Sequence, residues 1–315
     1  MKIAVIDDWQ NNARSFANWS RVEASHQLDF YADHLTGAAL IERLAPYDIL
    51  CVMRERTLFS EDVIAQLPAL KAVITSGMRN AGLDLAAFSA RNIPVSGTES
   101  PGHATAELAM IFIGMLARQT VANANSMSGT GWQVATGRDL RGATLGILGL
   151  GRLGSQLAEM AKVFGMNVQA WSQNLTAETC AEQGVAYADK EQFFATSDFI
   201  SLHLKLSPRV TGIVGAAELS LMKSDAYLVN TSRGPLIDVP ALCDALRASQ
   251  IAGAAIDVFD VEPLPADDVM RKTPNLLMTP HVGYATRETM SIFYGQTCES
   301  LEAYLAGSPI RLLSA

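Results

Sequence analysis

The sequence predicts an α/β protein with two doubly wound parallel-sheet domains. Short apolar segments alternate with helix-like segments along most of the 315 residues, which is the pattern of strands joined by crossover helices. A glycine-rich turn, Gly149-x-Gly151-x-x-Gly154, joins one of these strand segments to a helix segment. Polar residues also stand at the ends of several predicted strands, where parallel sheets place their ligand sites.

The first sheet is predicted from four strand-like segments and the helical segments between them. Strands are expected at residues 2–7, 49–53, 70–76 and 93–98, and helices at 36–45 and 60–68. Residues 101–127 read as one longer helix with apolar positions all round. A helix of that kind is buried on several sides, as where two domains meet.

The second sheet is predicted from the segments that follow. Strands are expected at residues 143–149, 167–172, 198–204, 226–232, 253–259 and 275–283, and residues 286–307 read as one amphipathic helix. We expect residues 1–98 and 283–315 to form one domain, with the last helix returning to it. Residues 99–282 should form the other.

Composition limits the classes of function. Hydrophobic residues make up 49% of the chain and charged residues 18%, as in globular proteins with a sizeable core. The net charge of −8 and the absence of any Lys/Arg-rich run argue against a nucleic-acid partner. No apolar run approaches the roughly 18 residues of a membrane span, and the apolar N-terminal run is too short for a signal peptide. A cytoplasmic location is therefore expected.

The four cysteines are scattered, with no C-x-x-C and no partnered histidine spacing. A chain of this size needs no disulfides for its stability. We expect free, mostly buried thiols at these positions, and no metal site.

The glycine turn has the spacing of a dinucleotide-binding turn. Gly149 permits the tight turn, Gly151 lets the backbone approach a pyrophosphate, and Gly154 lets helix and strand pack closely. The N–H groups and positive dipole end of the following helix then face the phosphates. A Rossmann domain is predicted. A glycine-rich packing turn without a ligand is the alternative.

The next strand lacks the acid that usually accompanies this turn. Dinucleotide-binding sheets carry a carboxylate about 20 residues further on to hold the ribose hydroxyls, whereas this strand ends in Ser172-Gln173-Asn174. No acid is present to repel a 2′-phosphate, and no arginine is present to attract one; Arg152, in the turn itself, is the nearest candidate. The choice between NAD and NADP stays open.

Three chemically active residues follow three predicted strands of the second unit: Arg233 in "NTSRG", Glu262 in "IDVFDVEP" and His281 in "TPHVG". The carboxyl ends of parallel strands meet at one edge, so we expect the three to converge. A histidine backed by a carboxylate, beside an arginine and a nicotinamide, can move a hydride and a proton together.

Structural alternatives exist for each of the three. The arginine could pair with Asp238 or Asp257, the histidine could lie in the core, and Asp260 competes with Glu262 as the supporting acid.

Nearly the whole chain resembles the D-isomer-specific 2-hydroxyacid dehydrogenase family. The matching motifs are "LGILGLGRLG", "LMKSDAYLVNTSRGPLID", "GAAIDVFDVEP" and "LLMTPHVGYAT", in the family's order. The resemblance implies a Rossmann cofactor domain plus a flavodoxin-like substrate domain, and a nicotinamide-dependent oxidoreductase. Its substrate would be a small D-2-hydroxy acid or 2-oxo acid of the 3-phosphoglycerate, glycerate/hydroxypyruvate or glyoxylate type. It favours NAD over NADP, and it suggests a homodimer through the cofactor domain with a contact near residues 125–133.

The resemblance also assigns roles. It implies that Arg233 binds the substrate carboxylate, that His281 is the acid/base, that Glu262 hydrogen-bonds this histidine, and that Asp257 holds the nicotinamide carboxamide. The chemistry agrees, because an imidazolium can donate a proton to the carbonyl oxygen as hydride reaches C2. An arginine binds a carboxylate through a planar fork that a lysine lacks. Only Glu262 precedes a proline, as in the family's pattern.

The predicted binding residues fall into two sets. The cofactor set is Gly149, Gly151, Arg152, Leu153, Gly154, Ser172, Thr105, Thr231, Asp257 and His203. The substrate set is Ser76, Gly77 and Met78, expected to offer backbone N–H groups to the substrate carboxylate, together with Arg54. With Arg56 and Arg79, Arg54 keeps a phosphorylated substrate possible. Two other classes compete with the enzyme: an NAD(H)-sensing regulatory protein on the same fold, and a methyltransferase or other nucleotide-binding enzyme sharing only the glycine turn.

Overall fold

The computed structural model describes residues 1–314 and separates into two compact units. Unit 1 consists of Met1–Pro101 together with the residues from Ala285 onward, and unit 2 consists of Gly102–Tyr284. The boundaries expected from the sequence, after residues 98 and 282, lie within three residues of these.

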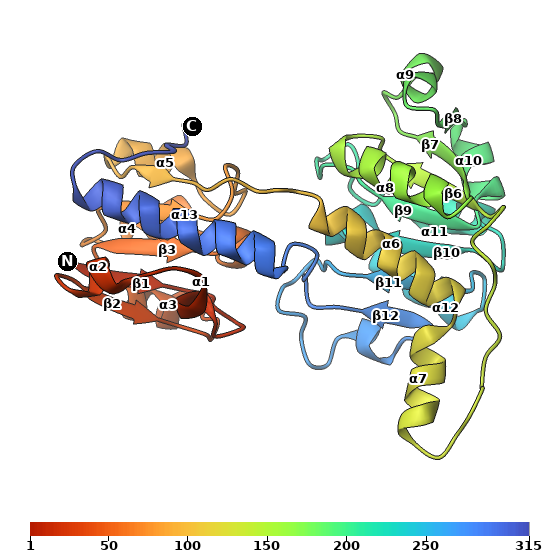
Figure 1. Ribbon diagram of the computed structural model, residues 1–315, viewed down its shortest axis with the longest axis horizontal. Helices are drawn as coiled ribbons and strands as arrows, with labels where there is room; N and C mark the ends of the chain where they lie inside the picture. Colours follow the sequence, from red (N-terminus) through yellow and green to blue (C-terminus); the bar gives the residue numbers. More distant parts are fainter. Residues whose placement is uncertain (315) are drawn as a thin grey trace. The chain divides into compact units, whose positions relative to one another are not determined.

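Unit 1 contains a parallel five-stranded sheet in the order β2-β1-β3-β4-β5 (Figure 1). This is the strand order of flavodoxin-like folds. Every residue of β3 and β4 is buried, as in parallel sheets whose two faces are both covered by helices. The strands are β1 (Lys2–Val5), β2 (Gln27–Phe30), β3 (Ile49–Val52), β4 (Ala72–Thr75) and β5 (Val95–Ser96).

The longest helix of unit 1 is the last in the chain, α13 (Arg287–Leu305). It packs against α1 and β4. The Tyr294 ring stacks on Phe16 with 6.2 Å between centroids, and its hydroxyl donates a hydrogen bond to Asp8 Oδ1 at 3.4 Å. The shorter helices are α1 (Ala13–Phe16), α2 (Ser20–Glu23), α3 (Gly37–Leu44), α4 (Glu61–Ala65) and α5 (Leu85–Ala90), with a 3-10 turn at Arg54–Arg56.

Unit 2 contains a parallel seven-stranded sheet in the order β12-β11-β10-β9-β6-β7-β8. Counted from β6, this is the Rossmann order with one further strand. The order reverses between β6 and β9, which is where such sheets bind ligands. The strands are β6 (Thr144–Leu148), β7 (Asn167–Trp171), β8 (Ala186–Tyr187), β9 (Phe199–Leu202), β10 (Tyr227–Asn230), β11 (Gly253–Ile256) and β12 (Leu276–Met278). The two sheets confirm the predicted fold class.

Helix α6 (Ala104–Ala117) is central to unit 2. It packs on α8 and against β10 and β11, and Ala106, Ala109 and Ile113 on it are completely buried. The other helices are α7 (Thr120–Ser128), α8 (Arg152–Val163), α9 (Ala177–Glu182), α10 (Lys190–Thr196), α11 (Ala216–Leu221) and α12 (Val239–Arg247), with 3-10 turns at Gly234–Leu236 and Val269–Lys272.

The predicted single helix over residues 101–127 is wrong, because the chain breaks it into α6 and α7 at Gln119. This residue has φ +49°, outside the right-handed helical region. Its side-chain amide donates hydrogen bonds to the carbonyl of Leu116 and to the hydroxyl of Tyr227, which replaces helical bonds lost at the break. No residue of α7 is buried, so the burial expected along the whole segment holds for α6 alone.

Two short edge strands, β2 and β8, were not predicted. β2 contains Gln27 and Asp29, β8 is only two residues long, and both have exposed positions. Apolar runs identify strands that are covered on both faces, and neither of these two strands has such a run. The cysteine prediction is confirmed, since all four are free and buried. Within residues 1–314, no helix is long and apolar enough to cross a membrane.

Candidate active site

The glycine turn follows β6 and leads into α8. Gly149 has φ +100°, which L-residues rarely adopt, and a Cβ there would lie 2.7 Å from Leu204 Cδ2. A Cβ on Gly154 would lie 2.3 Å from the Gly149 carbonyl oxygen, so turn and helix touch with no room for a side chain. A Cβ on Gly151 would meet no non-neighbouring atom within 4 Å. The turn therefore fits a pyrophosphate at the start of α8, where Arg152 and Leu153 present backbone N–H groups without intrahelical partners.

A buried hydroxyl at the same edge of the sheet fits a bound group. Thr231 directly follows β10, and its Oγ1 is buried without a hydrogen-bond partner in the described part of the chain. Buried polar atoms normally have a partner, so this atom fits a contact to a cofactor.

His203 follows β9, behind the glycine turn. Its Nε2 lies 2.9 Å from Ser201 Oγ, and burial lowers the pKa of its imidazole to about 4. Its carbonyl oxygen lies 3.0 Å from the place that a Cβ on Gly149 would take. The backbone of His203 therefore packs against the turn, and its imidazole is neutral at pH 7.

Asp257, which follows β11, organises the segment that carries His281. This completely buried carboxylate accepts hydrogen bonds from Thr279 Oγ1 at 2.5 Å and from the N–H groups of Val282 and Gly283 at 2.8 Å. Burial raises the pKa of the Asp257 carboxyl, although these three hydrogen bonds act in the opposite direction. Thr105, from the first turn of α6, donates to the Gly283 carbonyl at 3.2 Å and so holds the same segment from the other side.

His281 and Glu262 form a close pair at this edge. His281 Nδ1 lies 2.5 Å from Glu262 Oε2, and Glu262 Oε1 accepts a hydrogen bond from the Phe259 N–H at 2.8 Å. His281 has φ +52°, a left-handed conformation uncommon for any residue except glycine. Both side chains remain about a quarter exposed. The ring is thus held at Nδ1, and Nε2 is left for another molecule.

Arg233 follows β10, the strand next to β11. Asn230 fixes its backbone by donating to the Arg233 carbonyl at 2.9 Å and accepting from the Ser232 N–H at 3.0 Å. A Cβ on Gly234 would lie 2.3 Å from the Phe259 carbonyl carbon. The arginine segment therefore packs directly on the loop that carries Glu262.

The carboxylates considered as structural alternatives have other partners. Asp238 caps α12 by accepting from the Ala241 N–H at 3.1 Å, and Asp257 is held as described above. The acid beside His281 is Glu262 and not Asp260.

The substrate set predicted in unit 1 lies at the carboxyl ends of β3 and β4. Ser76 Oγ accepts a hydrogen bond from the Arg54 N–H at 2.9 Å, and a Cβ on Gly77 would lie 2.8 Å from Arg54 Nη1. Asn80 donates to the Arg54 carbonyl at 2.6 Å and to Thr75 Oγ1 at 2.9 Å. These residues form one cluster.

One expectation for this cluster needs correction. The Ser76 N–H donates to the Val52 carbonyl at 3.1 Å, and the Gly77 N–H donates to Thr98 Oγ1 at 2.8 Å. These two N–H groups are therefore occupied and do not await a substrate carboxylate. Among residues 76–78, only the N–H of Met78 has no hydrogen bond to the described residues.

The end of β7 also differs from expectation. Ser172 follows the strand without a neighbouring acid, as predicted, but an arginine does reach this loop: Arg209 contacts the next two residues, Gln173 and Asn174. Arg209 Nη2 lies 3.0 Å from Gln173 Oε1, whereas the Arg152 guanidinium packs beside Gly102, 2.6 Å from where a Cβ would lie.

A family model described as D-isomer specific 2-hydroxyacid dehydrogenase, NAD binding domain, matches residues 110–283. This stretch is more than half of the chain. The chain belongs to the D-isomer-specific 2-hydroxyacid dehydrogenase family. It is therefore an enzyme, an oxidoreductase with a nicotinamide cofactor. The regulatory hypothesis and the methyltransferase hypothesis are not supported.

Named relatives of this family cover nearly the whole chain. The glyoxylate reductase of Korarchaeum cryptofilum (strain OPF8) is 34% identical over 299 residues, which cover 91% of this chain and 89% of that protein. The D-3-phosphoglycerate dehydrogenase of Methanocaldococcus jannaschii is 34% identical over 280 residues, which cover 88% of this chain and 53% of that protein. The crystal structure of a phosphoglycerate oxidoreductase from Vibrio cholerae o395 matches with a TM-score of 0.91 at 33% identity. The match covers 98% of this chain and 100% of that one. Their names agree on the reaction class and differ in the acid.

Several residues that contact the candidate site residues were missed by sequence reasoning. Thr279 holds Asp257, Asn230 fixes the arginine segment, Asn80 fixes Arg54, and Arg209 lies at the end of β7. Asn230 and Thr279 stand within a few residues of Arg233 and His281, so a search for polar residues beside the catalytic candidates would have found them. Nothing in the local sequence connects Arg209 with Gln173.

Proposed function

We propose that this enzyme reduces a small 2-oxo acid to its D-2-hydroxy acid, or catalyses the reverse oxidation, with His281, Glu262 and Arg233 in the roles assigned above. The observation that carries the proposal is the 2.5 Å contact between His281 Nδ1 and Glu262 Oε2, on loops that follow strands of the same parallel sheet as the glycine turn, which fits a dinucleotide. A bound nicotinamide would supply or accept the hydride. A cytoplasmic location stays a prediction from the sequence.

The chain's own residues handle the proton and the carboxylate. Glu262 holds Nδ1, so Nε2 of a protonated His281 is the atom that gives a proton to the carbonyl oxygen as negative charge grows there. In the oxidation direction the neutral ring takes the hydroxyl proton at the same nitrogen. Arg233 is proposed to bind the substrate carboxylate with its guanidinium, whose Nη1 also donates to the Ser232 carbonyl at 2.7 Å. A two-point contact to the carboxylate would fix the angle of C2. The carboxamide role of Asp257 is limited to lone pairs that Thr279, Val282 and Gly283 leave unused.

The substrate is proposed to be short, of the glyoxylate, hydroxypyruvate or 3-phosphohydroxypyruvate type. Arg54 lies against Gly77 and the Met78 segment, where it could meet a second anionic group. Arg56 is used differently, because it stacks 4.1 Å from the Trp9 ring centroid and donates to the Asp7 carbonyl. Of the arginines kept open for a phosphate, Arg54 is therefore the better candidate, and Arg79 lies in the exposed part of the same loop.

A substrate panel tests this proposal directly. Oxidation of NADH and of NADPH would be followed at their nicotinamide absorbance with glyoxylate, hydroxypyruvate, 3-phosphohydroxypyruvate and pyruvate. We expect turnover with at least one of the first three, and product of D configuration wherever the product is chiral. An Arg54→Gln variant should lose turnover with the phosphorylated acid far more than turnover with glyoxylate. Absence of turnover with all four acids and both cofactors would contradict the proposal.

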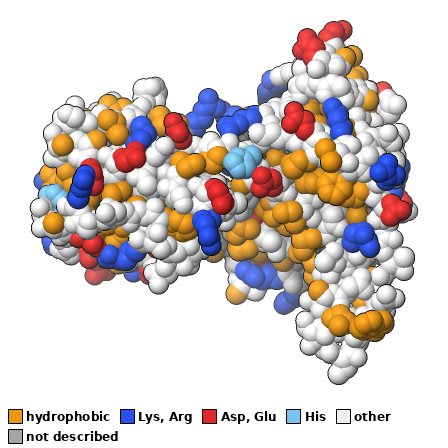
Figure 2. Space-filling view, in the orientation of Figure 1, with side chains coloured by type: hydrophobic (Ala, Val, Ile, Leu, Met, Phe, Trp, Pro, Cys, Tyr) orange, Lys and Arg blue, Asp and Glu red, His pale blue; other side chains and the backbone are white. Residues whose placement is uncertain are grey.

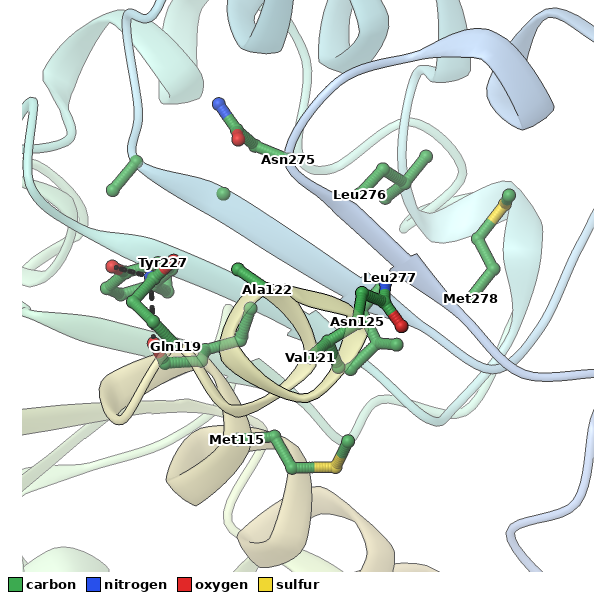
Figure 3. A pocket seen from close by; sticks show the side chains of 13 residues that line it. Met115, Gln119, Val121, Ala122, Asn125, Tyr227, Asn275, Leu276, Leu277 and Met278 are labelled. Carbon is green, nitrogen blue, oxygen red and sulfur yellow. Dashed lines mark hydrogen bonds between the residues drawn. The ribbon is translucent and has the colours of Figure 1, made fainter. Parts of the chain in front are cut away.

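We also propose a homodimer formed through unit 2. A groove of about 300 Å³ lies between α7 and the sheet edge at β11 and β12 (Figure 3). Its apolar lining includes Met115, Val121, Ala122, Leu276, Leu277 and Met278. Helix α7 exposes Met127, and the segment after it exposes Val134 and Trp132, the last at 70%. Apolar side chains gather at this end of unit 2 in Figure 2. A second copy could cover both surfaces at once, since a twofold dimer presents the same patch from each subunit.

Light scattering after gel filtration tests the dimer. The wild-type chain should elute as a dimer at micromolar concentration, and Leu277→Asp or Trp132→Ser should shift it toward monomer. Val163→Ser is the matched control, because Val163 is 85% exposed on α8, outside this groove. A monomeric wild-type chain, or equal effects of all three substitutions, would argue against this interface.

A further inference from the structure

A guanidinium lies beside the end of β7, where dinucleotide-binding sheets usually carry an acid. Arg209, in the loop after β9, places Nη2 3.0 Å from Gln173 Oε1 and 3.4 Å from Asn174 Oδ1. Gln173 Nε2 in turn donates to the Arg209 carbonyl at 3.4 Å. Contacts in both directions thus join two loops that are more than 30 residues apart in sequence.

The surroundings of Arg209 are free of negative charge in both loops. Residues 172–177 and 199–217 contain no Asp or Glu, and the second of these stretches also carries Lys205. No carboxylate of residues 1–314 forms an ion pair with Arg209, whose side-chain partners are the two neutral amides. An exposed guanidinium that contacts only neutral acceptors would form stronger hydrogen bonds with an anion. Hydrogen bonds between two charged groups are about twice as strong as those between neutral groups.

The position of this arginine relative to the glycine turn identifies the anion. Strand β7 is the neighbour of β6 on the side away from β9. A dinucleotide whose pyrophosphate lies on the turn after β6 brings its adenosine ribose to the end of that neighbouring strand. Ser172, the first residue after β7, stands where NAD-binding sheets carry the carboxylate that holds the ribose hydroxyls.

We infer that the enzyme prefers NADP(H) to NAD(H), and that Arg209 binds the 2′-phosphate of the adenosine ribose beside Ser172. This inference rests on the proposed function, because it assumes that a dinucleotide occupies the glycine turn. It reverses the preference for NAD that the family resemblance suggested. The 2′-phosphate carries between one and two negative charges near neutral pH. Arg209 attracts this charge, and the missing carboxylate does not repel it.

A different reading gives Arg209 only a structural task. Its contacts to Gln173 and Asn174 would then do no more than join two surface loops. In that case a 2′-phosphate would bring no gain, and the two cofactors would bind with similar affinity. Binding measurements separate the readings without reference to turnover.

The test is a set of dissociation constants measured by calorimetry at about 50 mM salt, where exposed charge pairs are only partly screened. The probes are NADPH, NADH, adenosine 2′,5′-bisphosphate and adenosine 5′-monophosphate. We expect the wild-type enzyme to bind NADPH at least about tenfold more tightly than NADH. Adenosine 2′,5′-bisphosphate should bind more tightly than adenosine 5′-monophosphate by a similar factor. Rising salt should reduce both ratios.

Three variants locate the effect. Arg209→Gln should weaken NADPH binding by about tenfold and change NADH binding by no more than about twofold. Ser172→Asp should weaken the binding of NADPH and strengthen the binding of NADH, because it restores the missing carboxylate. Arg141→Gln is the control that removes the same charge from unit 2. Arg141 precedes β6, at the opposite end of the strands, and lies beside Gly165. It should change neither constant.

The outcomes separate this inference from the proposed function. Equal affinities, or tighter binding of NADH, would overturn the NADP(H) preference while leaving a dinucleotide-dependent dehydrogenase intact. A preference for NADPH that survives Arg209→Gln would overturn the role of Arg209. Failure of both NADPH and NADH to bind would overturn the inference and the proposed function together.

Discussion

Nδ1 of His281 lies 2.5 Å from Oε2 of Glu262, and Oε1 of the same carboxylate accepts a hydrogen bond from the backbone N–H of Phe259. The imidazole is therefore held by an acid that is itself held by the loop after β11. A proton-transfer group needs this kind of fixed orientation. Removing the acid should affect the chemical step more than the binding of either ligand.

Glu262→Gln should lower the turnover number by about 10². A glutamine at this position keeps the size of the side chain but loses the carboxylate oxygen that holds Nδ1 of the imidazole. Steady-state rates measured with the best acid of the substrate panel would test this. Asp260→Asn is the matched control, since Asp260 lies two residues away and is not the partner of His281. Equal losses in both variants would contradict the assignment of Glu262.

Arg233→Lys should raise KM for the acid by roughly tenfold to a hundredfold and leave the cofactor dissociation constant nearly unchanged. Lysine keeps the charge but cannot make two parallel hydrogen bonds to a carboxylate. The measurements are KM for the acid and calorimetric binding of the cofactor. Arg247→Lys serves as control, because Arg247 pairs with Asp244 on α12. Similar weakening of acid and cofactor would argue against a substrate-carboxylate role.

Asp257→Asn should lower the free energy of unfolding by about 1–3 kcal/mol. The amide NH₂ of asparagine would face an N–H or O–H donor, since both carboxylate oxygens accept hydrogen bonds from Thr279, Val282 and Gly283. Urea unfolding checks the loss. Turnover should fall as well, because the same segment carries His281. Asp268→Asn, at the start of a surface 3-10 turn, is the control. Unchanged stability would show that the hydrogen bonds do not hold this segment.

Stability should depend on pH through His203. Burial lowers the pKa of this imidazole from 6.5 to about 4 in the folded chain, so protonation favours the unfolded chain. The contribution of His203 to stability is complete above about pH 6.5 and is lost as the pH falls toward 4. Between pH 7 and pH 5 the loss is up to about 2 kcal/mol.

A His203→Gln variant isolates this contribution. Unfolding free energies of the wild type and the variant would be compared at about pH 7 and about pH 5. The difference between the two proteins should shift in favour of the variant at the lower pH. Curves that stay parallel across this range would contradict the lowered pKa of His203.

The parts of the fold that could be predicted from the sequence are those that depend on the pattern of neighbouring residues. Apolar runs such as 49–53 and 226–232 identify central strands, because strands covered on both faces need apolar residues throughout. The glycines at 149, 151 and 154 are required by the turn itself. The break at Gln119 could not be predicted, since it depends on the hydroxyl of Tyr227, more than 100 residues away.

The candidate site, like the fold, has features that the sequence could predict and features that it could not. Glu262 and His281 could be paired from sequence because strand ends of one sheet meet at one edge. The occupied N–H groups of Ser76 and Gly77 could not be foreseen, because their acceptors are Val52 and Thr98 in other segments. The position of Arg209 depends on how the loops after β7 and β9 approach one another, which no local pattern records.

The role of His281 as proton donor is tested by the single-turnover rate of hydride transfer in His281→Ala, followed at the nicotinamide absorbance with enzyme in excess over cofactor. We expect this rate to be lower by about 10²–10⁴ than that of the wild type, with the cofactor dissociation constant unchanged within about twofold. A variant that transfers hydride at the wild-type rate would show that His281 is not the proton donor.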